Sequence, residues 1–272
     1  MDQYRVFGNP IAQSRSPFIH LAFARATGQQ LNYKSQFVEH GEFANAVNNL
    51  IAAKGKGANV TAPFKEEALA IADVLSDRAQ LAGAVNTLSF ENGKIYGDNT
   101  DGEGLVQDLL RHKIKLQGSN ILLLGAGGAA KGVLLPLLDQ NPTSITIANR
   151  TVSKADALIN QFNDDRLYAC GFEQTVDQEF ELIINATSAS LSGNLPAISS
   201  SIINSKVVCY DMVYSKQLTP FLSWAKEQGA ITVIDGLGML VGQAAVSFAI
   251  WRGVKPEVDP VIKQLKQALR ES

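Results

Sequence analysis

A glycine turn near the middle of the chain constrains the fold more than any other feature of the sequence. Ile121 to Leu124 is a run that is apolar on both faces, which is typical of a parallel strand covered by helices on each side. The turn Gly125 to Gly128 (GAGG) follows directly, and the segment from Ala129 to Leu138 favours a helix. Ala130 stands at the last position of the usual G-x-G-x-x-G pattern, an accepted variant that still lets helix and strand pack closely. The stretch predicts the strand, turn and helix of a dinucleotide-binding unit.

The end of the next expected strand, Ser144 to Ala148, indicates which dinucleotide is bound. A NAD site usually places a carboxylate there to bind the ribose 2′-hydroxyl. This chain instead has Asn149, Arg150 and Thr151, with Lys154 one helical turn further on. An arginine fork, a hydroxyl and a second cation suit a 2′-phosphate, so the cofactor predicted is NADP. The alternative is that the glycines only make a tight turn and that Arg150 is a solvated residue.

Length and charge narrow the class of protein. A chain of 272 residues suits two domains of ordinary size. Its formal net charge of −2 gives no reason to expect a nucleic acid or an anionic membrane as partner. No apolar run is long enough to span a bilayer, and the first residues lack the apolar core of a signal peptide. We therefore expect a cytoplasmic protein whose partner is a small-molecule substrate and not a nucleic acid or a membrane, and the sequence leaves open whether it is a monomer or a homodimer.

The cysteines and histidines do not indicate a disulfide or a metal site. Cys170 and Cys209 each lie beside apolar or aromatic residues, which favours buried free thiols. His20, His40 and His112 are scattered, and we expect no carboxylate or cysteine at ligand spacing from them.

The first part of the chain alternates between expected strands and helices, which indicates an α/β unit. Pro63 suits the first turn of a helix carrying Ala68 to Leu75, so Lys65 lies near the positive helix end, where a cation is disfavoured. A lysine at this unfavourable position is a hint of function, although exposed lysines are common in the first turns of helices. Asp101 opens another helix after a hairpin with an Asn92-Gly93 turn, and taken alone it suits an N-cap.

Taken together, the loops of this chain resemble those of the shikimate dehydrogenases over nearly the whole length. The motifs that carry the resemblance occur in the family's order: Ser14-Arg15-Ser16-Pro17, Asn59-Val60-Thr61 with Pro63 and Lys65, Ala84-Val85-Asn86-Thr87, Asn99-Thr100-Asp101-Gly102, the glycine turn, Asn149-Arg150-Thr151, Asn185-Ala186-Thr187-Ser188, Asp211-Met212-Val213-Tyr214, and Gly238 to Gln243. One departure is visible, because the family often has Asn-Pro after Tyr214 where this chain has Ser215-Lys216.

The resemblance implies an α/β fold with two domains and a particular activity. An N-terminal α/β substrate domain (1–101) would precede a Rossmann-type doubly wound dinucleotide-binding domain (102–237), and C-terminal helices (238–272) would return to the first domain. The implied activity is the reversible NADPH-dependent reduction of 3-dehydroshikimate to shikimate, in the pathway of aromatic amino-acid biosynthesis.

The resemblance also implies roles for individual residues. Lys65 and Asp101 would form the catalytic pair, with Lys65 as general acid and base. The residues implied around the substrate are Ser14, Ser16, Thr61, Lys65, Asn86, Asp101, Tyr214 and Gln243. The residues implied around the cofactor are Gly125, Ala126, Gly127, Gly128, Ala129, Asn149, Arg150, Thr151, Lys154, Thr187, Met212, Gly236 and Asp77.

Several alternatives remain open at this point. A quinate/shikimate dehydrogenase with broader substrate or cofactor use is one, and Arg150 and Lys154 argue against its NAD-using form. A methylene-tetrahydrofolate dehydrogenase would have a related architecture, but the hydroxyl-rich first loops favour a polyol acid. A non-catalytic sensor of NADP(H) is the last alternative, and the presence of both Lys65 and Asp101 speaks against it.

Overall fold

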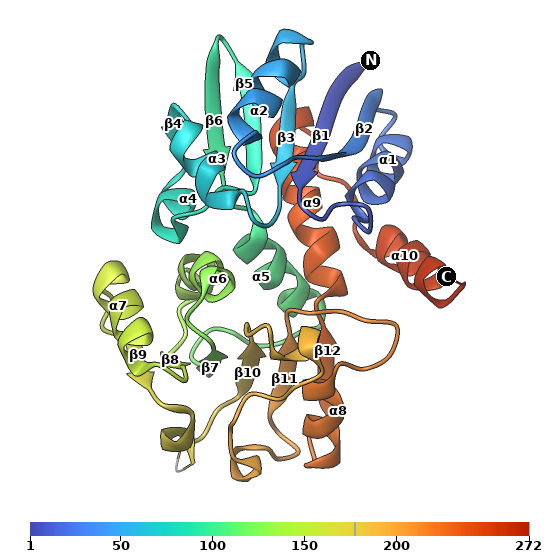
Figure 1. Ribbon diagram of the computed structural model, residues 1–272. Coiled ribbons are helices and arrows are strands. Elements are labelled where there is room, and N and C mark those ends of the chain that lie inside the picture. Colours follow the sequence, from blue (N-terminus) through green and yellow to red (C-terminus); the bar gives the residue numbers. More distant parts are fainter. Residues whose placement is uncertain (177, 272) are drawn as a thin grey trace. The chain divides into compact units, whose positions relative to one another are not determined.

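The computed structural model describes residues 1–176 and 178–271, and the chain divides into two compact units (Figure 1). Unit 1 comprises Met1–Gly104 and Leu240–Ser272, and unit 2 comprises Leu105–Met239. The divisions fall inside two helices, α5 (Asp101–Arg111) and α9 (Leu237–Arg252). The domain limits expected from the sequence, 101 and 237, stay predictions.

Unit 1 is built on a mixed sheet of six strands in the order β2-β1-β3-β5-β6-β4. The strands are β1 (Asp2–Gly8), β2 (Leu31–Phe37), β3 (Gly57–Val60), β4 (Val74–Leu75), β5 (Thr87–Glu91) and β6 (Lys94–Asp98). β1 pairs with β2 and β3 in parallel, whereas β5 and β6 form an antiparallel hairpin. Asn92 and Gly93 both have positive φ, at 52° and 73°, as the expected type I′ turn requires.

Helices of unit 1 connect and cover these strands. They are α1 (Ser16–Ala26), α2 (Phe43–Ala52), α3 (Lys65–Ile71), α4 (Asp77–Ala82) and α10 (Asp259–Glu271). Phe7, Phe43 and Phe64 are fully buried between β1, α2 and the start of α3. α10 contacts α1, so the C-terminal helix returns to the first unit as predicted.

Unit 2 contains a parallel sheet of six strands in the order β12-β11-β10-β7-β8-β9. The strands are β7 (Asn120–Leu124), β8 (Ser144–Ala148), β9 (Leu167–Cys170), β10 (Leu182–Asn185), β11 (Val208–Asp211) and β12 (Thr232–Asp235). The helices are α6 (Gly128–Leu138), α7 (Val152–Phe162) and α8 (Pro220–Glu227), with 3₁₀ turns η1 (Phe172–Thr175), η2 (Ala189–Ser192) and η3 (Ser200–Ile202). This is the doubly wound strand order of a Rossmann-type fold, which confirms the predicted fold class.

The two faces of the unit 2 sheet are both buried, and β7 shows why. Ile121 and Leu123 belong to one apolar cluster, whereas Leu122 and Leu124 belong to another. Successive side chains of a strand point to opposite faces, so a strand covered on both sides must be apolar at every position. The continuous apolar run in the sequence is therefore explained by its central place in the sheet.

Some local predictions differ from the structure. α3 ends at Ile71, and Leu75 lies in β4 instead of the same helix, because Ala72 is already extended with ψ of 130°. Ser16 is the first helical residue of α1 and not its cap, and its N–H donates to Ser14 Oγ at 3.3 Å. In the described part of the chain, no helix is both long and apolar enough to cross a membrane.

His20, on α1, is a fully buried histidine at the centre of an aromatic cluster. Its ring stacks on Tyr33 with centroids 4.2 Å apart and an interplanar angle of 7°. Among the described residues, neither ring nitrogen has a hydrogen-bond partner. The Asn59 side chain lies nearby, but its contact with the ring does not have the geometry of a hydrogen bond. Burial lowers the pKa of His20 to about 3, so the ring is neutral in the native state at neutral pH.

This burial predicts a loss of stability on acidification. The pKa of His20 is 6.5 when the chain is unfolded and about 3 when it is folded. Between these values the unfolded state binds a proton that the native state does not, so the free energy of unfolding falls as the pH falls. The slope approaches about 1.4 kcal/mol per pH unit well below pH 6.5. His20→Phe keeps a ring against Tyr33 and should remove this slope.

The measurement is urea unfolding at several pH values between 7.5 and 4.5, with and without His20→Phe. Trp224→Phe in both proteins leaves Trp251, in unit 1, as the sole fluorescent tryptophan of the chain. His112→Gln is the control and should leave the fall in stability on acidification in place, because the raised pKa of His112 contributes with the opposite sign. Parallel pH dependence with and without His20 would contradict the prediction.

Candidate active site

Lys65 lies at the first residue of α3, directly after the turn that leaves β3. The turn is closed by a hydrogen bond from the Phe64 N–H to the Thr61 carbonyl, at 3.1 Å. The Phe64 ring is fully buried and stacks on Phe43 at 5.3 Å, while the Lys65 carbonyl accepts from the Val85 N–H at 2.9 Å. The backbone of Lys65 is thus held on both sides, which limits the positions open to its side chain.

Asp101 lies at the first residue of α5, and its carboxylate faces the Lys65 side chain. Lys65 Nζ and Asp101 Oδ2 are 2.5 Å apart. The side chains are 32% and 21% exposed, so the pair is reachable by a ligand. The Asp101 N–H donates to Asn99 Oδ1 at 3.1 Å. The Asp101 carboxylate therefore binds other side chains and does not act as the helix cap that the isolated motif suggests.

Asn86 is the buried residue that holds the second oxygen of this carboxylate. Asn86 Nδ2 donates to Asp101 Oδ1 at 2.8 Å and lies 3.4 Å from Gln243 Oε1. Its backbone is fixed as well, because the carbonyl accepts from the Val60 N–H at 2.8 Å and the N–H donates to the Asp98 carbonyl at 3.0 Å. Each oxygen of Asp101 thus has its own donor, Asn86 for one and Lys65 for the other.

The other residues expected around a substrate fall into both units. Ser14 precedes α1, Ser16 opens it and Thr61 follows β3, and Gln243 lies on α9 with its Nε2 donating to the Leu240 carbonyl at 2.8 Å. The Ser16 side chain lies beside the buried Tyr33 hydroxyl. All of these belong to unit 1 together with Lys65, Asn86 and Asp101. Tyr214 follows β11 and belongs to unit 2.

The glycine turn of unit 2 fits a pyrophosphate. Gly125 has φ of +104°, and a Cβ there would lie 3.1 Å from Thr187 Cγ2. By contrast, a Cβ at Gly127 or Gly128 would meet no atom of the described residues within 4 Å, so these residues leave the backbone at the start of α6 uncovered. Gly127 is the N-cap and has no side chain to bind the first N–H groups of the helix. These N–H groups and the helix dipole suit a diphosphate.

A cluster of polar and basic residues follows the neighbouring strand β8. Asn149 Nδ2 donates to the Thr151 carbonyl at 2.8 Å, which folds the loop back on itself. Arg150, Thr151 and Lys154 are exposed. An exposed guanidinium, hydroxyl and ammonium within one loop and one helical turn are suited to bind a phosphate monoester.

Further residues expected at the cofactor lie at the same carboxyl edge of the unit 2 sheet. Thr187 Oγ1 donates to Asn185 Oδ1 at 2.7 Å beyond β10, and Met212 follows β11. Gly236 follows β12, where a Cβ would lie only 2.2 Å from the Met212 carbonyl oxygen, so this position requires glycine. Asp77, also expected at the cofactor, instead begins α4 in unit 1.

One expectation about the histidines is wrong. Asp108 lies one helical turn before His112, and His112 Nδ1 is 3.5 Å from Asp108 Oδ1. The hydrogen bond with Asp108 raises the pKa of His112. Asp108 also accepts from the Tyr210 hydroxyl at 2.8 Å, so it joins α5 to β11. In the part of the chain that the structure describes, no group of three or more His, Cys, Asp or Glu side chains could hold a metal. Cys170 and Cys209 are buried and free, as predicted.

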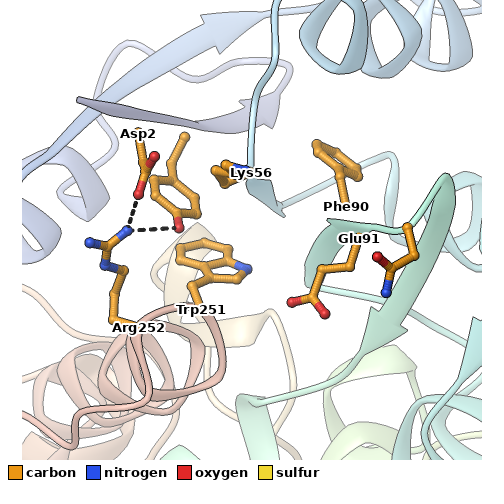
Figure 2. Close-up of a pocket in the computed structure, with 8 residues that line it drawn as sticks. Asp2, Lys56, Phe90, Glu91, Trp251 and Arg252 are labelled. Atoms are coloured by element: carbon orange, nitrogen blue, oxygen red, sulfur yellow. Dashed lines mark hydrogen bonds and ion pairs between the residues drawn. The ribbon is translucent and has the colours of Figure 1, made fainter.

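A cavity of about 430 Å³ lies elsewhere in unit 1 (Figure 2). It is lined by Asp2, Tyr4, Lys56, Phe90, Glu91, Asn92, Trp251 and Arg252. Arg252 donates to Asp2 and to Gln29 Oε1, the latter at 2.8 and 2.9 Å, so its charge is already neutralised within the protein. The lining includes none of the residues expected to bind a ligand. The cluster around Lys65 is therefore the stronger candidate for a reaction centre.

Sequence reasoning assigned no role to several buried polar residues beneath this centre. Asn59, Thr87, Thr100 and Ser247 are at most 6% exposed and connect to Asn86 through hydrogen bonds. For Ser247 a signal was present, because it lies one helical turn after Gln243 on the same face of α9.

Family models match most of the chain. The model described as shikimate dehydrogenase substrate binding domain matches residues 6–88. The model described as shikimate / quinate 5-dehydrogenase matches residues 107–195, and the one described as shikimate 5'-dehydrogenase C-terminal domain matches residues 236–266.

Individual relatives are similar over their full length. A protein of Colwellia psychrerythraea named shikimate dehydrogenase (NADP(+)) is 66% identical over 269 residues, covering 99% of this chain and 98% of that protein. The crystal structure of an Ael1 enzyme from Pseudomonas putida is 45% identical with a TM-score of 0.95, covering 97% and 98% of the two chains. Shikimate 5-dehydrogenase from Thermus thermophilus, in complex with NADP(H) and shikimate, is 31% identical with a TM-score of 0.89, covering 99% and 100%.

Proposed function

The chain belongs to the shikimate dehydrogenase family, and from that premise we propose that Lys65 and Asp101 are the residues through which it exchanges a proton with its substrate. It is an NADP-dependent oxidoreductase that acts on a CH–OH group. The reaction is the reversible reduction of 3-dehydroshikimate to shikimate, a step of the shikimate pathway that leads to aromatic amino acids. The contact of 2.5 Å between Lys65 Nζ and Asp101 Oδ2 is the observation that carries the assignment of roles.

Lys65 is assigned the role of general acid in the direction of reduction. When bound, NADPH supplies the hydride that reduces the ketone carbon. Negative charge then develops on the carbonyl oxygen, and an ammonium within hydrogen-bond reach can donate a proton to it. In the direction of oxidation the same amine accepts the proton of the substrate hydroxyl. Asp101 holds the Lys65 side chain through one carboxylate oxygen, while Asn86 fixes the other.

Short polar side chains of unit 1 are assigned to substrate binding. A ring that carries several hydroxyls and one carboxylate needs many donors and acceptors of limited reach, which Ser14, Ser16, Thr61, Asn86 and Gln243 supply. The two serines lie at the start of α1, where hydroxyl donors and the helix dipole together suit a carboxylate. Tyr214 of unit 2 is assigned to the same ligand from the family motif.

The cofactor is assigned to the carboxyl edge of the unit 2 sheet. The turn from Gly125 to Ala129, whose backbone is uncovered at Gly127 and Gly128, suits the pyrophosphate, and Arg150, Thr151 and Lys154 suit the 2′-phosphate. Asn149, Thr187, Met212 and Gly236 complete the assigned set. The role of Asp77 at the cofactor, the cytoplasmic location and the monomeric or homodimeric state stay predictions.

The direct test is a spectrophotometric assay of the purified protein. NADPH absorbance in the near ultraviolet should fall after addition of 3-dehydroshikimate, and much less with NADH or with 3-dehydroquinate. Comparable rates with both ketones would instead favour a quinate/shikimate dehydrogenase. Binding of NADPH, seen by its fluorescence, without oxidation by either ketone would favour a sensor and contradict the proposal.

A further inference from the structure

A cluster of buried hydroxyl and amide groups lies beneath the proposed catalytic pair. We define this buried polar cluster as Asn59, Asn86, Thr87, Thr100 and Ser247. Its members come from four segments of unit 1: β3, the start of β5, the residues before α5, and α9. Ser247 and Thr100 are 0% exposed, so neither can touch a substrate. Any effect of Ser247 on the reaction must pass through other side chains.

The orientation of the Asn86 carboxamide follows from its neighbours. The Thr100 backbone N–H, which can only donate, lies 2.9 Å from Asn86 Oδ1. The oxygen must therefore be on that side, and Nδ2 faces Asp101 Oδ1 at 2.8 Å. The Asn86 amide is thus a donor to the carboxylate that holds Lys65.

The hydroxyl protons of the cluster can be placed by the same reasoning. Thr87 Oγ1 is 2.8 Å from Asn86 Oδ1, which can only accept, so Thr87 donates its proton there. Ser247 Oγ is 2.8 Å from Thr87 Oγ1, and Thr87 has no second hydroxyl proton, so Ser247 is the donor of that bond. The competing acceptors for the Ser247 proton, the Gln243 carbonyl at 3.1 Å and Thr100 Oγ1 at 3.2 Å, are both further away.

These bonds form a directed series, and we propose that Ser247 is a positioning residue for proton transfer. Ser247 donates to Thr87, Thr87 to Asn86, and Asn86 to Asp101, the partner of Lys65. Hydrogen bonds in series polarise one another, so the first donor strengthens the last. The series also holds the Asn86 amide in the one orientation that presents a donor to Asp101. The inference rests on the proposed function, because it assigns Lys65 and Asp101 to the reaction.

The kinetic test uses a double-mutant cycle. Ser247→Ala removes the first donor, and Thr87→Val breaks the next link with little change in shape. Each should lower kcat about three- to tenfold, the cost of one lost hydrogen bond, with KM for shikimate and NADP changed by less than about twofold. If Ser247 acts through Thr87, the double variant should lose no more than Thr87→Val alone.

Controls separate positioning from general destabilisation. Ser89→Ala makes the same change at a different buried serine, which lies on β5 and outside the cluster. This variant should keep the wild-type kcat. Ser247→Thr restores the hydroxyl and should recover most of the turnover. The proposal would be overturned if the fold-losses of kcat in the two single variants multiplied in the double variant. It would also be overturned if Ser247→Ala lowered only the melting temperature and left kcat unchanged.

A second readout does not depend on turnover. The side-chain amide protons of Asn86 can be assigned by NMR from their loss in Asn86→Asp. Ser247→Ala should move these resonances upfield, because the bond to Asp101 is weakened, whereas Ser89→Ala should not. An unmoved resonance would overturn the positioning role. A wild-type protein without activity would contradict the proposed function. The NMR measurement would still test whether Ser247 acts on the bond between Asn86 and Asp101.

Discussion

Replacing Lys65 with alanine is expected to lower kcat for shikimate oxidation by about two to four orders of magnitude, the usual contribution of a positioned proton donor or acceptor. KM should change only modestly, because the other residues assigned to substrate binding, Ser14, Ser16, Thr61 and Gln243, are unchanged. Asp101 would keep its bond from Asn86 but lose the cation at 2.5 Å, so the amine that donates and accepts the proton would be missing.

Steady-state kinetics in both directions will measure this effect. Lys94→Ala is the matched control, because Lys94 is an exposed lysine of the same unit on β6, and it should behave as wild type. Small primary amines added to Lys65→Ala should restore part of the lost turnover. A Lys65→Ala protein that turns over at nearly the wild-type rate would exclude Lys65 as the acid and base.

Replacing Arg150 with alanine is expected to raise KM for NADPH by about 10- to 100-fold, the range for losing hydrogen bonds to a charged group. KM for NADH should hardly change, because NADH has no 2′-phosphate to bind. The guanidinium is exposed directly after β8, at the edge of the sheet where the glycine turn also lies. The effect should therefore fall on one cofactor and not on the fold.

The measurement compares KM for the two cofactors in wild type, Arg150→Ala and a control. Arg166→Ala serves as the control, because Arg166 lies in the same unit but pairs with Asp164 at 2.6 Å, away from the assigned cofactor residues. It should leave both KM values unchanged. Equal increases for NADPH and NADH in Arg150→Ala would remove the 2′-phosphate role and reopen the question of cofactor choice.

The parts of the fold that sequence reasoning predicted well are those with a strong local pattern. β7, the glycine turn, α6 and β8 follow from a doubly buried strand and a turn that only glycine permits. By contrast, β9 went unpredicted because it is the edge strand of its sheet and carries Tyr168, which is 55% exposed. An edge strand need not be apolar on both faces, so its sequence has little periodicity to detect.

The candidate site shows the same division between local and distant information. Lys65 drew attention because a cation at a helix start breaks a local rule, and family motifs pointed to Asp101. Ser247 and Asn59 meet through a bond of 3.0 Å between residues 188 positions apart. No local pattern of charge or polarity records such a contact. The buried polar cluster could therefore be recognised only from the three-dimensional structure.

The split of unit 1 into two segments has a consequence for the order in which the protein is made. Residues 105–239 lie between those segments, so the ribosome completes the sequence of unit 2 before that of unit 1. A nascent chain that ends before α9 has Asn59 and Asn86 but neither Gln243 nor Ser247. The groups assigned to proton transfer thus gain their full support only when synthesis is almost over.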